Sequence, residues 1–362
     1  MVEQVRYGVI GTGMMGVEHL NNLAITPGAR VTAIADPVET SLGWARAAMG
    51  DRAGEVHAFA DAAALAKSGL VDAVVVASPN HTHRAVLQPL FDAGLAILCE
   101  KPLATTLEDA RWIVERAEQS PRPFWTGMEY RFMPAAAAFI AQVHAGRVGR
   151  LQMLSIREHR FPFLPKVGDW NRFSRNTGGT MVEKCCHFFD LMRHIVGAEA
   201  VRVYCSGAMD VNHLDERYDG QMPDIIDNSY TVVDFANGVR AMLDLCMFAD
   251  GAENQEEMTA VGDRARLDVL IPQSVLVFSP RVGFRAEKRV GRETISVDPA
   301  ARAAGSHEGA TFYQHQAFIA AVRNEGPVAV TARDGLIAVA IGTAAEISAR
   351  EKRTVELSEL AL

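Results

Sequence analysis

The sequence has few of the features that mark secreted, membrane or nucleic-acid-binding proteins. It holds five cysteines in 362 residues, an odd number without the spacing of a disulfide scaffold, which favours a reducing compartment. No uninterrupted apolar run approaches the ~20 residues that span a bilayer. No basic run accompanies the net charge of −8. The first expected strand starts within a few residues of Met1 and leaves no room for a signal peptide. We therefore expect a cytoplasmic protein with no membrane and no nucleic-acid partner.

The first part of the chain alternates short apolar strands with helical segments. A chain of 362 residues exceeds the ~250–300 residues that one hydrophobic core usually supports, so two domains are expected. Strands are predicted at 5–10, 31–35, 73–77, 96–99 and about 123–127, and helices at 14–24, 39–49, 61–67, 82–92 and 106–119. This alternation predicts an α/β domain, residues 1–126, with a doubly wound parallel sheet of the Rossmann type.

The remainder, residues 127–362, has a different pattern. Strands are predicted at 150–160, 201–208, 229–236, 239–248, 257–262, 266–271 and 274–279, and helices at 134–145, 180–195, 310–324 and 333–350. Asn237-Gly238 between two apolar runs predicts a β-hairpin, and the polar stretch 209–227 predicts a long loop. We expect an α+β domain with a large, mostly antiparallel sheet that leaves one face open.

A glycine motif stands where the first strand ends. Residues 6–10 run directly into Gly11-Thr12-Gly13-Met14-Met15-Gly16, and a helix is predicted to follow. In this context the glycines permit a tight turn, let the backbone approach a pyrophosphate, and allow the helix to pack closely. Asp36 follows the second strand, twenty positions after Gly16, where it would accept hydrogen bonds from ribose hydroxyls and repel a 2′-phosphate. The motif predicts a dinucleotide site that favours NAD over NADP.

Polar residues also follow the third of these strands, in the segment Ser78-Pro79-Asn80-His81-Thr82-His83. Because ligands of open α/β sheets bind at the carboxyl ends of the strands, we expect Ser78, Pro79, Asn80 and His83 to contact the cofactor. An alternative is a turn followed by a helix start, with Asn80 or Thr82 as N-cap, and both can hold together.

Glu100-Lys101-Pro102 follows the next strand. Burying an ammonium group is costly unless it is paired or used, so Lys101 is a candidate catalytic residue. In a cleft beside a nicotinamide its pKa would fall, which suits proton exchange with a substrate hydroxyl. The alternative is a solvated lysine on a loop.

Glu183, His187, Asp190 and His194 are spaced 4, 3 and 4, which puts them on one face of the helix predicted at 180–195. His187 could accept a proton and Asp190 could orient its ring. Thr180 and Glu183 alternatively fit a capping box. We expect no metal here, since the adjacent Cys185 and Cys186 would point about 100° apart on a helix. These cysteines are expected to be small buried residues.

Together these motifs give the chain, over essentially its whole length, a resemblance to the Gfo/Idh/MocA oxidoreductase family. The motifs are the glycine motif, Pro79–His83, Glu100-Lys101-Pro102, Glu129-Tyr130-Arg131-Phe132, Trp170-Asn171-Arg172 and Gly178–Asp190. The resemblance implies that Lys101 hydrogen-bonds the reacting hydroxyl and that Glu100 contacts the nicotinamide ribose. It also implies that His187 is the general base, and that Glu183 stands where the family has an aspartate.

The resemblance further implies that Glu129, Trp170 and Arg172 lie on the cofactor side of the site. Tyr130, Lys166, Asp169, Trp170 and Asn171 are candidate substrate-pocket residues, since an aromatic face with amide and charged groups suits a polyhydroxylated ring. The expected function is NAD-dependent oxidation of a secondary hydroxyl of a sugar, cyclitol or sugar derivative to a ketone. The expected assembly is a homodimer or homotetramer formed through the second domain's sheet. The alternatives are another bound-dinucleotide reaction, such as imine reduction or redox-assisted glycoside cleavage, and a non-catalytic NAD-binding sensor.

Overall fold

The computed structural model describes residues 4–360, and contacts group these residues into two compact units. The first unit contains the segment that ends at Phe132, together with 166–170 and 297–339. The second contains 133–165, 171–296 and the segment from Ala340 onward. The domain division at 126/127 stays a prediction, and the return of 297–339 to the first unit had no signal in the sequence.

The first unit contains a six-stranded parallel sheet with the strand order β3-β2-β1-β4-β5-β6. Its strands are β1 (Val5–Ile10), β2 (Ala29–Ala35), β3 (His57–Phe59), β4 (Ala73–Val76), β5 (Ala96–Glu100) and β6 (Phe124–Gly127). Its helices are α1 (Met14–Ile25), α2 (Glu39–Met49), α3 (Ala62–Ala66), α4 (His83–Asp92), α5 (Leu107–Gln119), α10 (Pro299–Ala304) and α11 (Ala310–Val322). The predicted parallel, doubly wound fold is confirmed. Strand β3 was not predicted because it has three residues, none of them buried.

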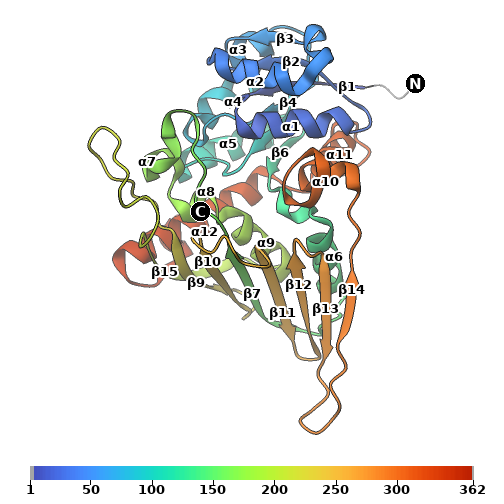
Figure 1. The fold of residues 1–362 in the computed structure, drawn as a ribbon, viewed down its shortest axis with the longest axis vertical. Coiled ribbons are helices and arrows are strands. Elements are labelled where there is room, and N and C mark those ends of the chain that lie inside the picture. Colours follow the sequence, from blue (N-terminus) through green and yellow to red (C-terminus); the bar gives the residue numbers. More distant parts are fainter. Residues whose placement is uncertain (1–3, 361–362) are drawn as a thin grey trace. The chain divides into compact units, whose positions relative to one another are not determined.

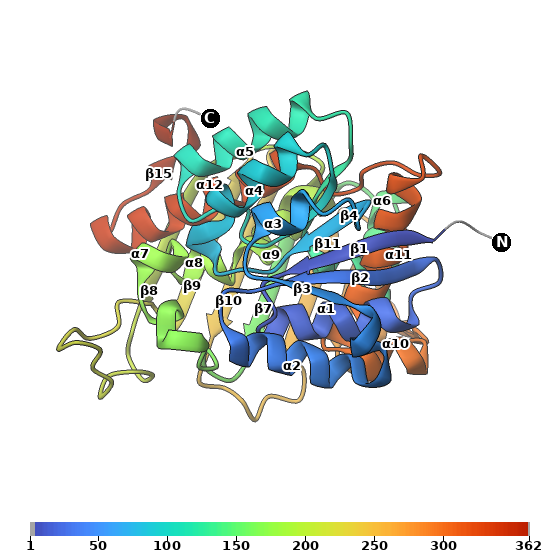
Figure 2. The same cartoon turned by 90° about the horizontal axis from the view of Figure 1, so that it is seen from above.

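Helices cover both faces of this sheet. Helices α1 and α2 lie on one face, and α3, α4 and α5 lie on the other (Figure 2). The central strands are buried on both sides, which explains why they read as continuous apolar runs. Helix α11 adds Phe318, whose ring packs against Tyr7 of β1 and Trp125 of β6. A distant segment therefore completes the core of the first unit.

The second unit is built on one broad sheet of nine strands, which Figure 1 shows running from β15 to β14. Its strand order is β14-β13-β12-β11-β7-β10-β9-β8-β15. The strands are β7 (Leu151–His159), β8 (Ala200–Ala208), β9 (Asn228–Phe235), β10 (Arg240–Cys246), β11 (Glu256–Gly262), β12 (Ala265–Ile271), β13 (Val275–Pro280), β14 (Gly291–Thr294) and β15 (Val355–Glu356). The helices are α6 (Pro134–His144), α7 (Ser174–Thr177), α8 (Thr180–Glu183) and α9 (Cys186–Val196), while α12 (Ala332–Glu351) begins in the first unit and ends in the second.

The pairing in this sheet agrees with the predicted mostly antiparallel arrangement. Strands β7 and β10 pair in parallel, whereas the other paired neighbours are antiparallel. The predicted hairpin at Asn237-Gly238 joins β9 to β10, and Gly238 adopts the positive φ of 87° that such turns require. The predicted loop 209–227 is largely irregular.

Burial alternates along the central strands of the second sheet. Leu154, Val233 and Leu243 point into the core on the side where α6 and α9 pack. The opposite side exposes five large apolar side chains. They are Met153, Tyr204, Tyr230, Val232 and Met242. Cross-strand register places Val232 opposite both Tyr204 and Met242, so these side chains share one face. We call this surface the open sheet face.

The helix predicted at 180–195 is not continuous. Helix α8 ends at Glu183 and α9 begins at Cys186. The N–H of Cys185 donates to the carbonyl oxygen of Thr180, five residues back, which widens the helical turn at this point. In residues 4–360, the structure contains no helix long and apolar enough to cross a membrane.

Candidate active site

The glycine motif forms the turn between β1 and α1, and each glycine is required for a different reason. Gly11 has a φ of 82°, and a Cβ there would lie 2.6 Å from the backbone of Ala77. A Cβ on Gly16 would collide with the carbonyl oxygen of Gly11. A Cβ on Gly13 would meet no atom within 4 Å, so the helix N-terminus opens there onto free space. Since the first N–H groups of a helix have no partner within the helix, this end of α1 fits a pyrophosphate.

Asp36 lies at the end of β2, beside the glycine turn. Its Oδ2 accepts hydrogen bonds from the backbone N–H of Thr12 at 2.8 Å and from the Thr12 hydroxyl at 3.3 Å. Its Oδ1 accepts from the N–H of Val38 at 2.9 Å. The carboxylate is thus fixed at the strand end, where it would meet the ribose of a dinucleotide.

The segment after β4 contains one polar group without a partner and one fully buried histidine. Asn80 is 7% exposed, and its Nδ2 has no hydrogen-bond partner among the described residues, which fits an amide that contacts a ligand. The ring nitrogens of His83 lie 3.2 Å from the carbonyl oxygens of Ser78 and Leu103. Burial lowers the pKa of His83 despite these bonds. His83 thus contacts the loop after β4 through Ser78 and the loop after β5 through Leu103, and links the two loops.

Thr82 occupies the N-cap position of α4, but its side chain forms no capping hydrogen bond. Its hydroxyl donates to the carbonyl oxygen of Pro79 at 2.6 Å and lies 2.8 Å from the Ser78 Oγ. The hydroxyl groups of this segment therefore form hydrogen bonds within the segment itself. The amide of Asn80 takes no part in them and is available to bind a ligand.

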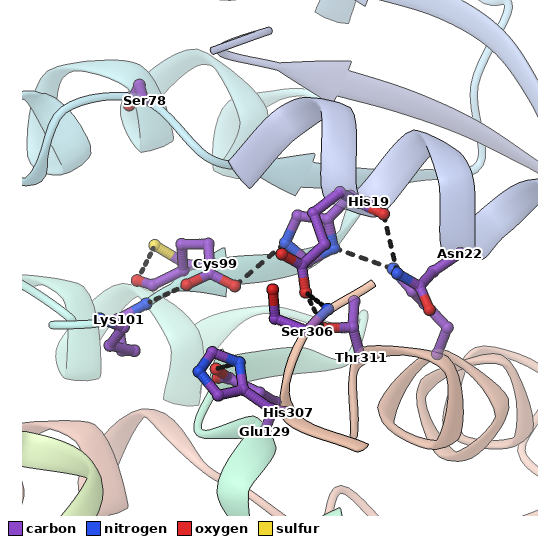
Figure 3. Close-up of polar contacts among 12 residues, drawn as sticks. His19, Asn22, Ser78, Cys99, Lys101, Glu129, Ser306, His307 and Thr311 are labelled. Atoms are coloured by element: carbon purple, nitrogen blue, oxygen red, sulfur yellow. Dashed lines mark hydrogen bonds and ion pairs between the residues drawn. The ribbon is translucent and has the colours of Figure 1, made fainter. Parts of the chain in front are cut away.

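Glu100 and Lys101 follow each other at the end of β5. Glu100 is buried, and its Oε2 accepts a 3.1 Å hydrogen bond from the backbone N–H of Lys101. Its Oε1 lies 3.0 Å from the Nε2 of His19, which belongs to α1 (Figure 3). Burial alone would raise the pKa of Glu100, but His19 and Lys101 lower it below its ordinary value. A buried carboxylate thus stands directly beside the candidate catalytic lysine.

Glu129 lies at the end of β6 on the turn η3 (Glu129–Phe132) and is 2% exposed. Burial and the neighbouring negative charge of Glu100 raise the pKa of Glu129 to about 8, against the opposing charge of Lys101. His307 approaches Glu129 with its Nδ1 3.7 Å from Oε1, as Figure 3 shows. The ring of His307 also lies 4.8 Å from that of Tyr130, which is buried. The ends of β5 and β6 therefore bring two carboxyl groups, a lysine and a histidine into one neighbourhood of the first unit.

Lys166, Asp169 and Trp170 also belong to the first unit. The Lys166 Nζ lies 5.1 Å from the centre of the Trp170 ring, and the ring of His81 lies 6.0 Å from it. The turn η4 (Val167–Arg172) is kinked at Asp169, which has a φ of 51°. Lys166 and Trp170 are thus neighbours, and His81 of the loop after β4 lies beside the Trp170 ring.

Asn171 and Arg172 belong to the second unit and are buried. The Nδ2 of Asn171 donates to the carbonyl oxygen of Leu164 at 3.1 Å. The Nε of Arg172 donates to Oε2 of Glu216 at 2.8 Å. Burial alone would raise the pKa of Glu216, but hydrogen bonds from His213, Tyr218 and Arg172 lower it. Arg172 therefore anchors the loop 209–227, and its predicted contact with the cofactor stays a prediction.

Glu183, His187 and Asp190 are each at most 4% exposed and lie on the segment that includes α8 and α9. The alternative capping box is wrong. The N-cap of α8 is Gly179, and the Thr180 hydroxyl donates to the carbonyl oxygen of Ile226 at 2.6 Å. The N–H of Met181 donates instead to Oε1 of Glu346 on α12, at 2.9 Å.

Cys185 and Cys186, in this segment, are buried, as predicted. Burial raises the pKa of the Cys185 thiol well above its ordinary value. Within the described part of the chain, no group of three or more His, Cys, Asp or Glu side chains is arranged to hold a metal ion.

Sequence reasoning missed three histidines of the first unit, namely His19, His307 and His315. His19 and His315 lie on apolar helices, where a histidine gives no signal of its own. His307 lies on a short turn, η5 (His307–Gly309), with φ of 53°, next to Glu308 at 55°. Two consecutive non-glycine residues with positive φ mark a constrained loop, but only the folded chain reveals it.

Comparison with known proteins gives matches to one oxidoreductase family over most of the chain. Residues 5–128 match the model described as the oxidoreductase family with an NAD-binding Rossmann fold, and residues 140–357 match the family's C-terminal alpha/beta domain. Among relatives, a myo-inositol 2-dehydrogenase of Thermotoga maritima is 28% identical over 357 residues, which are 98% of this chain and 99% of that protein.

Solved structures share the fold over the whole chain. The crystal structure of a probable dehydrogenase from Thermotoga maritima has a TM-score of 0.79 and 27% identity, and covers 98% of this chain and 99% of that one. A scyllo-inositol dehydrogenase from Lactobacillus casei, solved with NAD(H) and scyllo-inositol, has a TM-score of 0.76, with 21% identity, covering 98% of this chain and 100% of that one. Since the two family models together match most of the chain, this protein belongs to the Gfo/Idh/MocA family of NAD-binding oxidoreductases.

Proposed function

We propose that this protein is an NAD-dependent dehydrogenase that oxidises one secondary hydroxyl of a cyclitol or sugar to a ketone, with inositols as the first candidates. The observation that carries the proposal is the position of Lys101. It follows the end of β5 in an NAD-binding Rossmann unit and stands next to the buried carboxylate of Glu100. A protein that only binds a dinucleotide has no need for an ammonium group at this place. The inositol dehydrogenase named above supports the choice of substrate class.

The residues present fit NAD. The N-terminus of α1 with its three glycines would hold the pyrophosphate, Asp36 would accept hydrogen bonds from the adenosine ribose, and Asn80 offers an unpaired amide. NAD, when bound, supplies the hydride acceptor. The carboxylate of Asp36 disfavours a 2′-phosphate, which supports NAD over NADP.

Lys101 and His187 would share the work at the reacting oxygen. The Lys101 ammonium would donate a hydrogen bond to the hydroxyl oxygen and stabilise the negative charge that develops on it. His187 would accept the hydroxyl proton while the hydride leaves the same carbon, so the alcohol becomes a ketone. Glu183 is proposed to bind a substrate hydroxyl, since the capping role that could have explained it is absent.

Substrate recognition is proposed for residues on η3 and η4. The ring of Trp170, flanked by Lys166, offers an apolar face to the C–H groups of a sugar or cyclitol ring, while the carboxylate of Asp169 accepts hydrogen bonds from hydroxyls. Tyr130 and Asn171 would shape the pocket, because both are buried and fixed by neighbouring residues.

The open sheet face is proposed to bind a second copy of this chain. It carries large apolar side chains at 38–63% exposure together with paired charges such as Arg202 with Asp234 and Arg157 with Glu257. A surface that holds both charge signs next to apolar groups can be complementary to itself, as a two-fold interface requires.

A substrate panel tests the proposal. The purified protein is incubated with myo-inositol, scyllo-inositol, common aldoses and levoglucosan, each with NAD and with NADP, and reduced cofactor is followed by its absorbance. We expect turnover with at least one cyclitol or sugar and a preference for NAD. Cofactor that stays bound and is never released in reduced form, with no net reduction on any member, would contradict the dehydrogenase assignment.

A further inference from the structure

Two buried histidines form a chain behind the carboxylate that precedes Lys101. The Nε2 of His19 lies 3.0 Å from Oε1 of Glu100, and the Nδ1 of His19 lies 2.9 Å from the Nε2 of His315. Both histidines are fully buried, and they come from α1 and α11. Positions 19, 100 and 315 are thus brought together by tertiary packing alone.

The direction of the hydrogen bonds follows from the charges. Glu100 is an anion at neutral pH, because its interactions with His19 and Lys101 outweigh the effect of burial on its pKa. It therefore accepts, and the Nε2 of His19 carries the hydrogen. Burial, reinforced by His19, lowers the pKa of His315 well below its ordinary value, so His315 is neutral. A neutral imidazole carries one hydrogen, so the Nε2 of His315 either donates to the Nδ1 of His19 or accepts from it.

The far end of the chain supports donation by His315. The Nδ1 of His315 has no hydrogen-bond partner among the described residues, and neither has the hydroxyl of Tyr7, whose ring packs edge-on against His315 at 5.8 Å. The opposite direction would place an unpaired N–H on the buried Nδ1 of His315. Orphaned buried N–H groups are rarer in folded proteins than under-used acceptors. We therefore infer that His315 donates a hydrogen bond to His19 and that His19 donates one to Glu100.

We propose that His19 and His315 are positioning residues that fix the carboxylate of Glu100 as an anion beside Lys101. This inference rests on the proposed dehydrogenase function. One oxygen of Glu100 accepts from His19 and the other from the N–H of Lys101 at 3.1 Å, so both oxygens are held. The anion stabilises the ammonium form of Lys101, which must donate to the substrate oxygen.

Other ionisable groups face Glu100 from the neighbouring elements. They are Lys101 after β5, Glu129 on η3 and His83 on α4, and each interacts with the charge of Glu100. These groups remain when the histidine chain is removed. Its removal takes away a hydrogen-bond donor from Glu100, so the carboxylate should take up a proton at higher pH than in the wild type.

The experiment compares His19→Leu, His19→Gln and His315→Leu with the wild type over pH 4–9. We expect the acid limb of kcat/KM in His19→Leu to move up by about one pH unit, an approximately tenfold loss below the limb. His19→Gln, whose amide can still donate to Glu100, should restore most of the activity. His315→Leu leaves His19 in place as the partner of Glu100. It should shift the acid limb of kcat/KM in the same direction but by less. It also provides the test if His19→Leu fails to fold.

A second measurement does not depend on turnover. In protein with 15N-labelled histidine, His19 and His315 are assigned by loss of their signals in the variants. At neutral pH each should carry a hydrogen on Nε2 and none on Nδ1. If no substrate in the panel is turned over, the proposed function fails and this measurement alone decides the histidine chain. An unshifted acid limb in both leucine variants would overturn the inference, as would a hydrogen on Nδ1 of His19 or of His315.

Discussion

The backbone N–H of Thr12 donates a 2.8 Å hydrogen bond to Asp36, a residue 24 positions later in the chain. The Asp36 carboxylate is suited to bind the ribose of NAD. It also holds the glycine turn, which is suited to bind the pyrophosphate of NAD. We therefore expect both cofactor choice and the order of the glycine turn to depend on this one side chain.

Asp36→Asn separates these two tasks, because the amide oxygen can still accept from Thr12 while the negative charge is gone. We expect the dissociation constant for NADH to rise by about tenfold and that for NADPH to fall, since a 2′-phosphate is no longer repelled. Fluorescence titration with both reduced cofactors measures this. An unchanged preference for NADH over NADPH would argue against the role of Asp36 in selectivity.

Gly13→Ala and Gly16→Ala form a matched pair within one turn. Gly13 has a φ of −73°, and its Cβ would meet no protein atom, so Gly13→Ala should unfold at the wild-type temperature yet bind NADH at least about tenfold more weakly. In Gly16→Ala the Cβ collides with the carbonyl oxygen of Gly11, so we expect a loss of stability on the order of 1–3 kcal/mol. Thermal unfolding and NADH titration distinguish the two. Wild-type NADH affinity in Gly13→Ala would rule out close approach of the pyrophosphate there.

Lys101→Met and His187→Ala test the two residues assigned to the reacting oxygen. Loss of a general acid–base or charge-stabilising group typically lowers kcat by about 100-fold or more. NADH binding should stay within about threefold of the wild type, because neither residue is needed to hold the pyrophosphate. Lys67→Met, at an exposed lysine after α3, is the matched control and should retain full turnover. Steady-state kinetics on the best substrate of the panel measures all three, and normal turnover in Lys101→Met would exclude its role.

Glu346→Gln should change how stability depends on pH. Burial raises the pKa of Glu346 to about 7, and although the N–H of Met181 and Arg350 lower it, Asp224 raises it further. A carboxyl group with a raised folded-state pKa stabilises the fold most at low pH, and this contribution is lost as pH rises through about 7. Gln mimics the protonated form and can still accept from Met181.

The free energy of unfolding of Glu346→Gln should therefore match the wild type near pH 5. At pH 8 it should exceed the wild type by an amount on the order of 2–3 kcal/mol. Glu351→Gln, at an exposed position on the same helix, should show no such pH dependence between these values. Denaturant unfolding at both pH values checks this, and parallel curves for Glu346→Gln and wild type would contradict it.

Val232→Lys combined with Met242→Lys tests the open sheet face. The two side chains are cross-strand neighbours, so the double variant places two positive charges at one point of the proposed contact. We expect the assembly to dissociate into smaller species, measured by light scattering during gel filtration. Trp44→Lys, at an exposed aromatic of α2, should leave the assembly intact. A double variant of unchanged mass would place the contact between copies elsewhere.

The sequence was most informative where chemistry depends on neighbours along the chain. The strands of the first unit are apolar runs bounded by turn residues, and the residues after them are placed by the topology of a parallel sheet. For this reason Gly13, Asp36, Asn80 and Lys101 could be found directly. The three-residue strand β3 was missed because it has no buried side chain to show a pattern.

Features that depend on packing between distant segments could not be predicted. Thr180 and Glu183 have the spacing of a capping box, but Glu346, 165 positions beyond Met181, takes the N–H of Met181 instead. His19 and His315 carry no signal, because only the packing of α1 against α11 brings their rings together. Sequence spacing describes one helix at a time, whereas these contacts join several.

Helix α11 lies more than 180 residues after β6, yet its Phe318 fills the core between Tyr7 and Trp125 and its His315 hydrogen-bonds His19 of α1. During synthesis, the first unit therefore has an uncovered apolar surface until nearly the whole chain has left the ribosome. A fragment that stops after β6 would contain the glycine motif and Lys101 but lack this cover. We expect such a fragment to bind chaperones or aggregate, so cofactor capture should follow completion of the chain.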